Sequence, residues 1–228
     1  PRLFYYIIAN GQQVTIFSSF FLAKQYLQFK NRAERIEKEK VKAELNFLKA
    51  QINPHFYFNT LNNLYGLALL KSDKAPNAIL KLSEIMEYVI YDARTEQVPL
   101  EREIEYLKNY VELECLRLEE NAKVLFKVEG EGQGLQIAPL LLLPLVENAF
   151  KHGTINAEKI DIEIVIQIDE KESCLKLSVK NYFEASNRKT GLGIENLRKR
   201  LNLMYWNQYE LEGKEKGHWY ISKLNLQL

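Results

Sequence analysis

The chain has 228 residues, of which 46% are hydrophobic and 11% aromatic, and its formal net charge is +1. This apolar content suffices for one substantial core and a smaller helical unit. The small net charge argues against an electrostatic grip on nucleic acid, which needs a clear excess of lysine and arginine. The two cysteines, Cys115 and Cys174, have neither a disulfide-framework nor a zinc-type spacing, so a reducing compartment is predicted.

Residues 1–24 are mostly apolar, but the polar quartet "NGQQ" interrupts them at Asn10–Gln13. The span Leu3–Ala23 is about as long as the roughly 20 residues that cross a bilayer, while a central polar quartet is costly there. Two interpretations stay open: the remnant of a transmembrane helix, or a packed amphipathic helix. The many lysines and arginines between Lys24 and Lys42 place the following residues in the cytoplasm by the positive-inside rule. The predicted localisation is therefore the cell inner membrane, with this region cytoplasmic.

Residues 25–96 are expected to form a stalk and a helical hairpin. Residues 25–50 are charged and free of glycine, which is typical of an exposed helix or a coiled-coil stalk. Apolar residues at spacings of three and four carry the helical pattern into "KAQINPHFYFNTLNNLYG", and a second helix begins near Pro76. Because a hairpin has little core of its own, we expect two copies to pair as a four-helix bundle in a homodimer.

Residues 97–228 alternate between helical and strand patterns. Strands interleaved with helices predict an α+β fold, an α/β sandwich whose mixed or antiparallel sheet carries helices on one face. The expected helices are Val98–Asn121, Ile137–Gly153 and Gly193–Tyr205, and the expected strands are Lys123–Val128, Lys159–Asp169, Cys174–Asn181, Tyr209–Gly213 and His218–Leu228.

The first candidate site is His55, which follows Pro54 inside an apolar helical pattern. A proline in a helix interior removes a backbone hydrogen bond and bends the axis, so its presence beside a histidine calls for a functional or structural explanation. His55 falls at the border of the apolar stripe, and Asn59 lies one turn further, where its amide could hold one ring nitrogen and leave the other free. The alternatives are a nucleophile and a partly buried packing residue.

The second candidate site is "PLVENAFKHG", where an apolar helix ends in Glu147, Asn148, Lys151 and His152. Spacings of three and four place these residues on one helical face. An amide oxygen, an ammonium and an imidazole together suit a polyphosphate that carries magnesium, because magnesium prefers oxygen ligands. The alternative is an ordinary polar helix end.

The third candidate site is "KTGLGIENLRKRL", in which Gly191 and Gly193 would let the backbone approach a ligand at the start of a helix. A loop that merely enters a helix is the alternative. Arg198 and Arg200 either reach phosphates or solvate the helix.

Taken in this order, "FLKAQINPHFYFNTLN", "PLVENAFKHG" and "GLGIENLRKRL" resemble the LytS-type sensor histidine kinases. In these proteins a phosphoacceptor hairpin precedes an ATP-binding domain of the GHKL (Bergerat) type. The resemblance extends from about Glu37 to the C terminus. It implies that residues 25–96 contain the hairpin and that residues 97–228 are the ATP-binding domain.

The resemblance also implies roles for single residues. His55 corresponds to the phosphorylated histidine, and the helical spacing described above lets Asn59 orient its ring. Asn148 corresponds to the asparagine that holds Mg²⁺, and Glu147, Lys151 and His152 line the same ATP pocket. Gly191 and Gly193 correspond to the glycines of the lid that covers the phosphates.

Two positions depart from the family pattern. Many histidine kinases carry an acidic residue directly after the phosphoacceptor, but this chain has Phe56, so the residue that accepts the His55 proton is unassigned. Where GHKL proteins have an aspartate that binds the adenine amino group, this chain has Asn181 in "VKNYFEA". An amide can still hydrogen-bond adenine, but it lacks the negative charge.

The predicted function is the cytoplasmic core of a two-component sensor histidine kinase, with ATP and Mg²⁺ as cofactors. It acts as a homodimer, is attached to the membrane by its N-terminal segment, and passes phosphate to an aspartate of a response regulator of the LytTR type. One alternative is a dimeric signalling scaffold with the same fold and little or no activity. Another is an ATP-driven clamp, which would not need the histidine-bearing hairpin.

Overall fold

The computed structural model describes residues 22, 24–32, 34–39, 54–118, 122–153, 160–182 and 192–228. Residues 24–32 and 34–39 are helical and exposed. Most of the predicted transmembrane remnant at residues 1–24, and much of the stalk that follows it, lie outside the described residues. In the described ranges, no helix combines the length and the apolar character that a membrane crossing requires. Asn53–Leu228 belong to one compact unit, in which the candidate sites lie.

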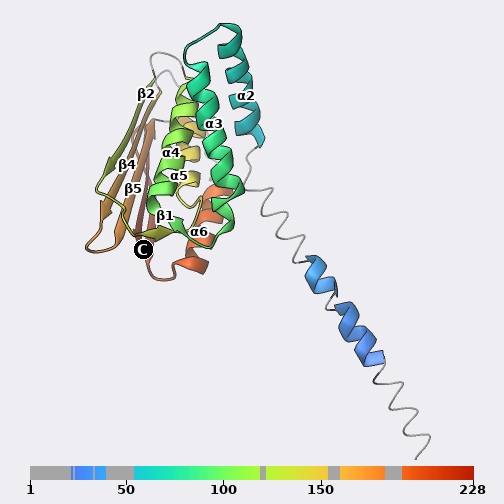
Figure 1. The fold of residues 1–228 in the computed structure, drawn as a ribbon. Helices are drawn as coiled ribbons and strands as arrows, with labels where there is room; N and C mark the ends of the chain where they lie inside the picture. The colour runs from blue at the N-terminus through green and yellow to red at the C-terminus, as the bar shows by residue number, and fades with distance from the viewer. Residues whose placement is uncertain are drawn as a thin grey trace, which may run out of the picture. The chain divides into compact units, whose positions relative to one another are not determined.

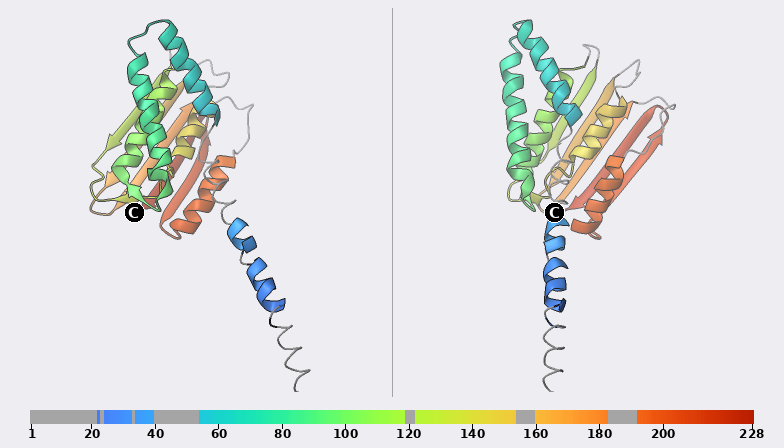
Figure 2. Two further views of the ribbon diagram at one scale, coloured as in Figure 1. Left: turned by 45° about the vertical axis from the view of Figure 1, so that its right-hand side comes forward. Right: turned by 90° about the vertical axis from the view of Figure 1, so that its right-hand side faces the viewer.

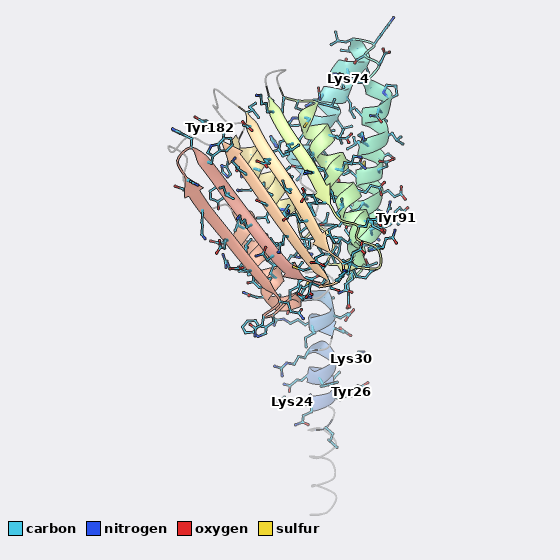
Figure 3. All side chains as sticks on the ribbon, turned by 90° about the vertical axis from the view of Figure 1, so that its left-hand side faces the viewer. Lys24, Tyr26, Lys30, Lys74, Tyr91 and Tyr182 are labelled. Carbon is cyan, nitrogen blue, oxygen red and sulfur yellow. The ribbon has the colours of Figure 1, made fainter. Side chains whose placement is uncertain are left out.

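The predicted helical hairpin is present as α2 (Pro54–Leu69) and α3 (Ala75–Ile90) (Figure 1). Pro76 lies in the first turn of α3, where a missing backbone N–H costs nothing. Figure 3 labels Lys74 and Tyr91, the residues that flank α3 at its two ends. The apolar residues of α3 that recur at spacings of three and four are buried, as a helix with one packed face requires. These residues are Ala78, Leu82, Ile85 and Val89.

The third helix is shorter than predicted. It is α4 (Leu100–Cys115), and the predicted first residues form the short strand β1 (Val98–Pro99) instead. Strand β1 pairs antiparallel with β3 (Gln136–Ile137). Proline restricts the residue before it to extended conformations, which explains why the helix cannot begin at Val98.

The predicted mixed sheet is confirmed. Its five strands among the described residues have the order β2-β4-β5-β7-β6, and β2–β4 is the parallel pair. The other three pairs are antiparallel. Residues on alternate positions of β4 are buried, so one face of the sheet carries the core. The strands are β2 (Lys123–Glu129), β4 (Asp161–Asp169), β5 (Cys174–Tyr182), β6 (Tyr209–Lys216) and β7 (Trp219–Gln227).

Helices α4, α5 (Leu143–Gly153) and α6 (Leu192–Met204) cover one face of the sheet, and the hairpin packs on the outer side of α4 (Figures 1 and 2). Helix α4 is therefore buried on two sides, against the sheet and against the hairpin. This explains why polar residues such as Glu103 and Asn109 are buried on it together with Leu107 and Tyr110.

The apolar helix predicted at Ile137–Gly153 begins only at Leu143. Residues 138–142 form a loop between β3 and α5, and Leu140 in this loop has a φ of 55°. A leucine rarely adopts this left-handed conformation, which costs about 1–3 kcal/mol and must be held by its surroundings. Pro139 inside the predicted helix explains the break, and Pro144 fits in the first turn of the observed helix.

Glu103 of α4 holds this loop from one side. Its carboxylate is fully buried and accepts hydrogen bonds from the backbone N–H groups of Leu140 (2.9 Å) and Leu142 (3.2 Å). The Tyr88 hydroxyl of α3 donates a hydrogen bond to the same carboxylate. One buried side chain thus joins the hairpin to the loop that leads into α5.

Helix α6 holds the loop from the other side. The Arg200 guanidinium donates to the carbonyl oxygens of Pro139 (2.8 Å) and Leu140 (3.3 Å). The backbone N–H of Ala138 donates to the Tyr205 hydroxyl at 2.8 Å. Arg200 therefore positions the start of α5, a role that its place in the sequence did not reveal.

We expect Glu103→Ala to lower the free energy of unfolding by about 3 kcal/mol or more, because each buried polar group left without its partner costs about 1–3 kcal/mol. Urea denaturation at about pH 4, below the unfolded pKa of a glutamate, measures this loss. The matched control is Glu105→Ala, which removes an exposed carboxylate of the same helix whose ion pair with Arg102 spans 3.1 Å. Exposed pairs contribute about 0–1 kcal/mol. Equal losses in the two variants would contradict the role of Glu103.

The stabilisation by Glu103 has a defined pH dependence. Burial raises the pKa of Glu103, although the hydrogen bond from Tyr88 and those from the two amides oppose the shift. A carboxyl group with a raised folded-state pKa contributes stability that is full below the unfolded pKa of about 4.3 and is lost as the pH rises through the folded pKa. The stability difference between the wild type and Glu103→Ala should therefore shrink as the pH is raised from about 4.3.

Candidate functional site

His55 lies in the first turn of α2 and is exposed. The side-chain amide nitrogen of Asn59, one turn further, is 3.2 Å from Nδ1 and 3.1 Å from Nε2 of the ring. It can donate a hydrogen bond to whichever ring nitrogen carries the lone pair. A rotation of the amide would instead present its oxygen to the protonated nitrogen and leave the other nitrogen free. The pair thus combines an accessible imidazole with a group that selects its tautomer.

Phe56 anchors the start of α2 on α4. Its ring is 4% exposed and stacks on Tyr110, with centroids 4.7 Å apart and an interplanar angle of 27°. Further along α2, the Asn63 amide donates to the carbonyl oxygen of Leu116 at 3.2 Å. An acidic residue at position 56 would be buried against an aromatic ring, which explains why this position is apolar.

The rings continue from α4 to α5. Tyr110 meets Phe150 edge to face, with centroids 6.3 Å apart. The ring contacts Phe56–Tyr110 and Tyr110–Phe150 therefore connect the helix of His55 with the helix that carries the second candidate site. The structure places both within the compact unit Asn53–Leu228.

Helix α5 carries the predicted polar residues on one side. Glu147 and Asn148 are half-buried, Lys151 is exposed and His152 is half-buried. Burial lowers the pKa of His152, and the positive charge of Lys151 lowers it further, so the neutral imidazole is favoured. Burial is the main reason that the pKa of Tyr110 is raised, and the negative charge of Glu147 also raises it. This side of α5 offers amide and carboxylate oxygens beside an ammonium group, which suits a phosphate chain and an oxygen-loving cation.

The end of α5 meets the end of β5. A Cβ atom on Gly153 would lie 3.2 Å from the Cβ of Asn181, so a glycine here lets the helix approach the strand closely. Asn181 is 1% exposed, and its amide donates to the carbonyl oxygen of Tyr182 at 3.2 Å. Figure 3 labels Tyr182, which ends this strand. The structure thus brings Asn181 beside the helix of Asn148.

The glycine-rich stretch is described only in part. Gly191 and the preceding residues 183–190 lie outside the described residues. Gly193 is exposed in the first turn of α6, and a Cβ built on it would meet nothing within 4 Å. A side chain at position 193 would therefore meet no described neighbour, so packing within the described residues does not require a glycine there.

The sequence analysis missed one buried ion pair of α4. Glu114 of α4 is 7% exposed, and the Arg117 guanidinium donates to its two oxygens at 3.2 and 3.0 Å. Burial raises the pKa of Glu114; Arg117 and a hydrogen bond from Tyr110 lower it, Glu147 raises it, and His55 lowers it. The sequence does place two aromatic residues, Tyr106 and Tyr110, four apart on one side of this helix. Both are buried in the structure, so their spacing could have indicated that this side is packed.

Residues 43–122 match the family model described as Histidine kinase. The Sensor protein LytS of Staphylococcus saprophyticus is 30% identical over 185 residues, covering 75% of this chain and 31% of that protein. The Sensor protein LytS of Bacillus cereus is 33% identical over 153 residues, covering 67% and 24%, respectively. The chain thus spans at most about a third of the length of these two relatives.

Among solved structures, the histidine kinase domain of the Erythrobacter litoralis EL346 blue-light activated histidine kinase aligns with a TM-score of 0.44 and 14% identity. The alignment covers 81% of this chain and 93% of that domain. The family model covers the helix of His55 and all of α3 and α4, and the relatives extend the similarity over most of the chain. The chain belongs to the histidine kinase family, and within it to the LytS type.

Proposed function

We propose that the chain is the kinase core of a two-component sensor, which phosphorylates His55 with ATP and passes the phosphoryl group to an aspartate of a response regulator. The observation that carries this proposal is the placement of an exposed imidazole and the polar side of α5 in one compact unit. Two successive ring contacts, one stacked and one edge to face, join the two helices through α4. A polar helix end or a packing histidine alone would require no such connection.

His55 would act as the nucleophile. A neutral ring nitrogen attacks the γ-phosphorus of ATP in line with the leaving oxygen, and catalysis relies mainly on positioning and charge neutralisation. Asn59, within 3.2 Å of both ring nitrogens, would hold the tautomer that leaves the attacking nitrogen unprotonated. The first turn of α2 presents the ring to solvent, where a nucleotide can reach it.

The polar side of α5 would bind the phosphates and the cation. The Asn148 amide oxygen would be a ligand of Mg²⁺, and Lys151, Glu147 and His152 would line the phosphate site. In the described ranges, no three His, Cys, Asp or Glu side chains cluster as metal ligands. This donor set fits Mg²⁺, which takes few protein ligands and keeps phosphate oxygens and waters. When bound, the ion would neutralise charge on the phosphates.

Asn181 would bind the adenine. Its amide lies buried at the junction of α5 and β5, where a purine edge could pair with it. Gly191 and Gly193 would belong to the segment that closes over the phosphates. We further propose that residues 25–96 act as stalk and hairpin and that residues 97–228 act as the nucleotide-binding domain.

The hairpin would form the homodimer interface. Helices α2 and α3 expose large apolar side chains at helical spacing, and stripes of this kind commonly mark a binding surface. We propose that two hairpins bury these stripes in a four-helix bundle, that a segment before residue 25 attaches the protein to the membrane, and that the regulator is of the LytTR type. The exposed side chains are Phe58, Leu61, Tyr65 and Leu69 on α2 and Ile79, Met86 and Ile90 on α3.

We expect Leu61→Glu to weaken dimerisation by about 100-fold or more, because a charge buried in an apolar interface without a partner costs several kcal/mol. Leu61 is 53% exposed in the single chain, so the substitution should leave the fold intact. Analytical ultracentrifugation over a concentration series measures the dimer dissociation constant. Lys216→Glu at the end of β6 is the control that changes charge away from the hairpin. A dimer of unchanged affinity in Leu61→Glu would exclude this interface.

The kinase proposal is tested by incubating the chain with Mg²⁺ and γ-labelled ATP. We expect covalent label that acid removes and base preserves, as a phosphorus–nitrogen bond behaves. Addition of a LytTR-type regulator should then move the label to a receiver aspartate. Binding of ATP without any label would overturn the kinase proposal and favour the signalling scaffold.

A further inference from the structure

The Tyr88 hydroxyl has no part in the function proposed so far. Tyr88 lies on α3, is 2% exposed, and its ring packs on that of Tyr106, with centroids 4.7 Å apart. A phenylalanine would supply the same ring packing, so the packing leaves the hydroxyl unexplained. The hydroxyl donates to the carboxylate of Glu103, which is fully buried on α4. What the hydroxyl does is therefore decided by what Glu103 holds.

Glu103 holds the loop 138–142, through which the chain enters α5. Its carboxylate accepts hydrogen bonds from the backbone N–H groups of Leu140 at 2.9 Å and Leu142 at 3.2 Å. Leu142 directly precedes the first residue of α5. Glu103 thus fixes the backbone at the start of this helix, and Tyr88 is the donor that orients Glu103 from the hairpin.

Leu140 is the residue of this loop whose conformation depends most on such contacts. Its φ of 55° is unfavourable for a leucine, so its surroundings must hold it. Glu103 accepts from its N–H group, and Arg200 of α6 donates to its carbonyl oxygen at 3.3 Å. Charged side chains from two helices thus hold both backbone polar groups of one strained residue. A weaker hold lets the loop relax towards ordinary backbone conformations, and the start of α5 shifts with it.

A shift at the start of α5 reaches Asn148. Asn148 follows Leu143, the first residue of the helix, by five residues, which is about 7.5 Å along a helix axis. The amide oxygen of Asn148 is the Mg²⁺ ligand proposed above. Metal sites lose about 10–100-fold in affinity when the groups that orient the ligands are removed. The hold on the loop 138–142 is therefore expected to matter for binding of Mg²⁺.

We propose that Tyr88 is a positioning residue of the nucleotide site, which acts through Glu103 and the loop 138–142 to hold Asn148 in place for Mg²⁺-ATP. The inference rests on the proposed kinase function. It assigns one hydroxyl of the hairpin to the nucleotide-binding domain. The hairpin that carries His55 thereby also shapes the site that supplies the phosphate.

The test compares Tyr88→Phe with the wild type in binding of a fluorescent ATP analogue over a series of Mg²⁺ concentrations. Tyr88→Phe keeps the ring that packs on Tyr106 and removes only the hydroxyl. We expect the Mg²⁺ concentration at half-saturation to rise about 10-fold and the affinity for the analogue without Mg²⁺ to stay unchanged. The matched control is Tyr91→Phe, which should bind as the wild type does, because Tyr91 at the end of α3 is 70% exposed.

A double-mutant cycle with Asn148→Ala separates positioning from a general weakening of the fold. If Tyr88 acts through Asn148, Tyr88→Phe should have no further effect on the Mg²⁺ dependence in the Asn148→Ala background. Amide hydrogen exchange gives a second measurement, which needs no nucleotide. The amides of Leu140 and Leu142 should exchange faster in Tyr88→Phe, while those of β4 keep the wild-type rate.

Three outcomes would overturn the inference. An unchanged Mg²⁺ dependence in Tyr88→Phe would exclude a positioning role for the hydroxyl. An equal loss in both backgrounds, or faster exchange throughout the sheet, would assign Tyr88 a structural role only. A wild-type chain that binds no Mg²⁺-ATP would overturn the proposed function and the inference with it. The binding series on the wild type alone reveals this last case, which separates the two failures.

Discussion

Replacing His55 with glutamine is expected to remove all covalent label from the chain and to leave its affinity for ATP unchanged. Glutamine is polar and of similar length, but it has no nucleophilic ring nitrogen, so no bond to phosphorus can form. The His55 side chain is exposed, and exposed substitutions usually change stability by no more than about 0.5 kcal/mol. Label from γ-labelled ATP and binding of a fluorescent nucleotide measure the two quantities on the same preparation.

The chain contains three histidines, so substituting each in turn covers every histidine that could carry the label. His218 is the control, because it lies in the turn between β6 and β7, outside α2 and α5, and its ring stacks on Tyr182 at 5.5 Å. His218→Gln should be labelled at the wild-type rate. Label that survives in His55→Gln and maps to His152 would place the phosphoacceptor on α5 and contradict the proposal.

Replacing Asn148 with alanine is expected to lower the labelling rate about 1,000-fold, since a bound metal ion supplies several kcal/mol of charge stabilisation. The amide oxygen is the proposed Mg²⁺ ligand on the half-buried side of α5, and alanine removes it without enlarging the side chain. Asn148→Asp keeps an oxygen ligand and should retain part of the activity. Initial labelling rates over a series of Mg²⁺ concentrations measure both effects.

Asn202→Ala is the matched control, because Asn202 is exposed on α6 and accepts a hydrogen bond from Tyr209 at 2.6 Å. It should leave both the rate and its Mg²⁺ dependence unchanged. If Asn148→Ala needed no more Mg²⁺ than the wild type and reached the same rate, Asn148 would not hold the ion.

The two helices that begin later than predicted share one cause. The helix predicted at Val98–Asn121 loses its first two residues to β1, and the helix predicted at Ile137–Gly153 begins at Leu143. Both errors occur where proline stands inside an apolar run, at Pro99 and Pro139. An apolar run indicates only that a segment is buried. The conformation at Val98–Pro99 is decided by pairing with β3, and that of the loop before α5 by contacts such as the hydrogen bond of Leu140 to Glu103.

The sequence by itself determined the elements whose patterns are local. Alternation of apolar and polar residues predicted β4 and β5, because a strand exposes successive side chains to opposite faces. Spacings of three and four predicted the hairpin and placed Asn148 and Lys151 on one side of a helix. The contact of His55 with Asn59 follows from the same spacing.

Only the tertiary structure decided what these elements pack against. The bond between Glu103 and Leu140 joins residues 37 apart in sequence, and the bond between Asn63 and Leu116 joins residues 53 apart. Periodicity shows that one side of α4 is buried, but it carries no information about its partner. The backbone groups of the loop obtain a buried acceptor only when distant elements meet, so the environment of Glu103 is a property of the assembled fold.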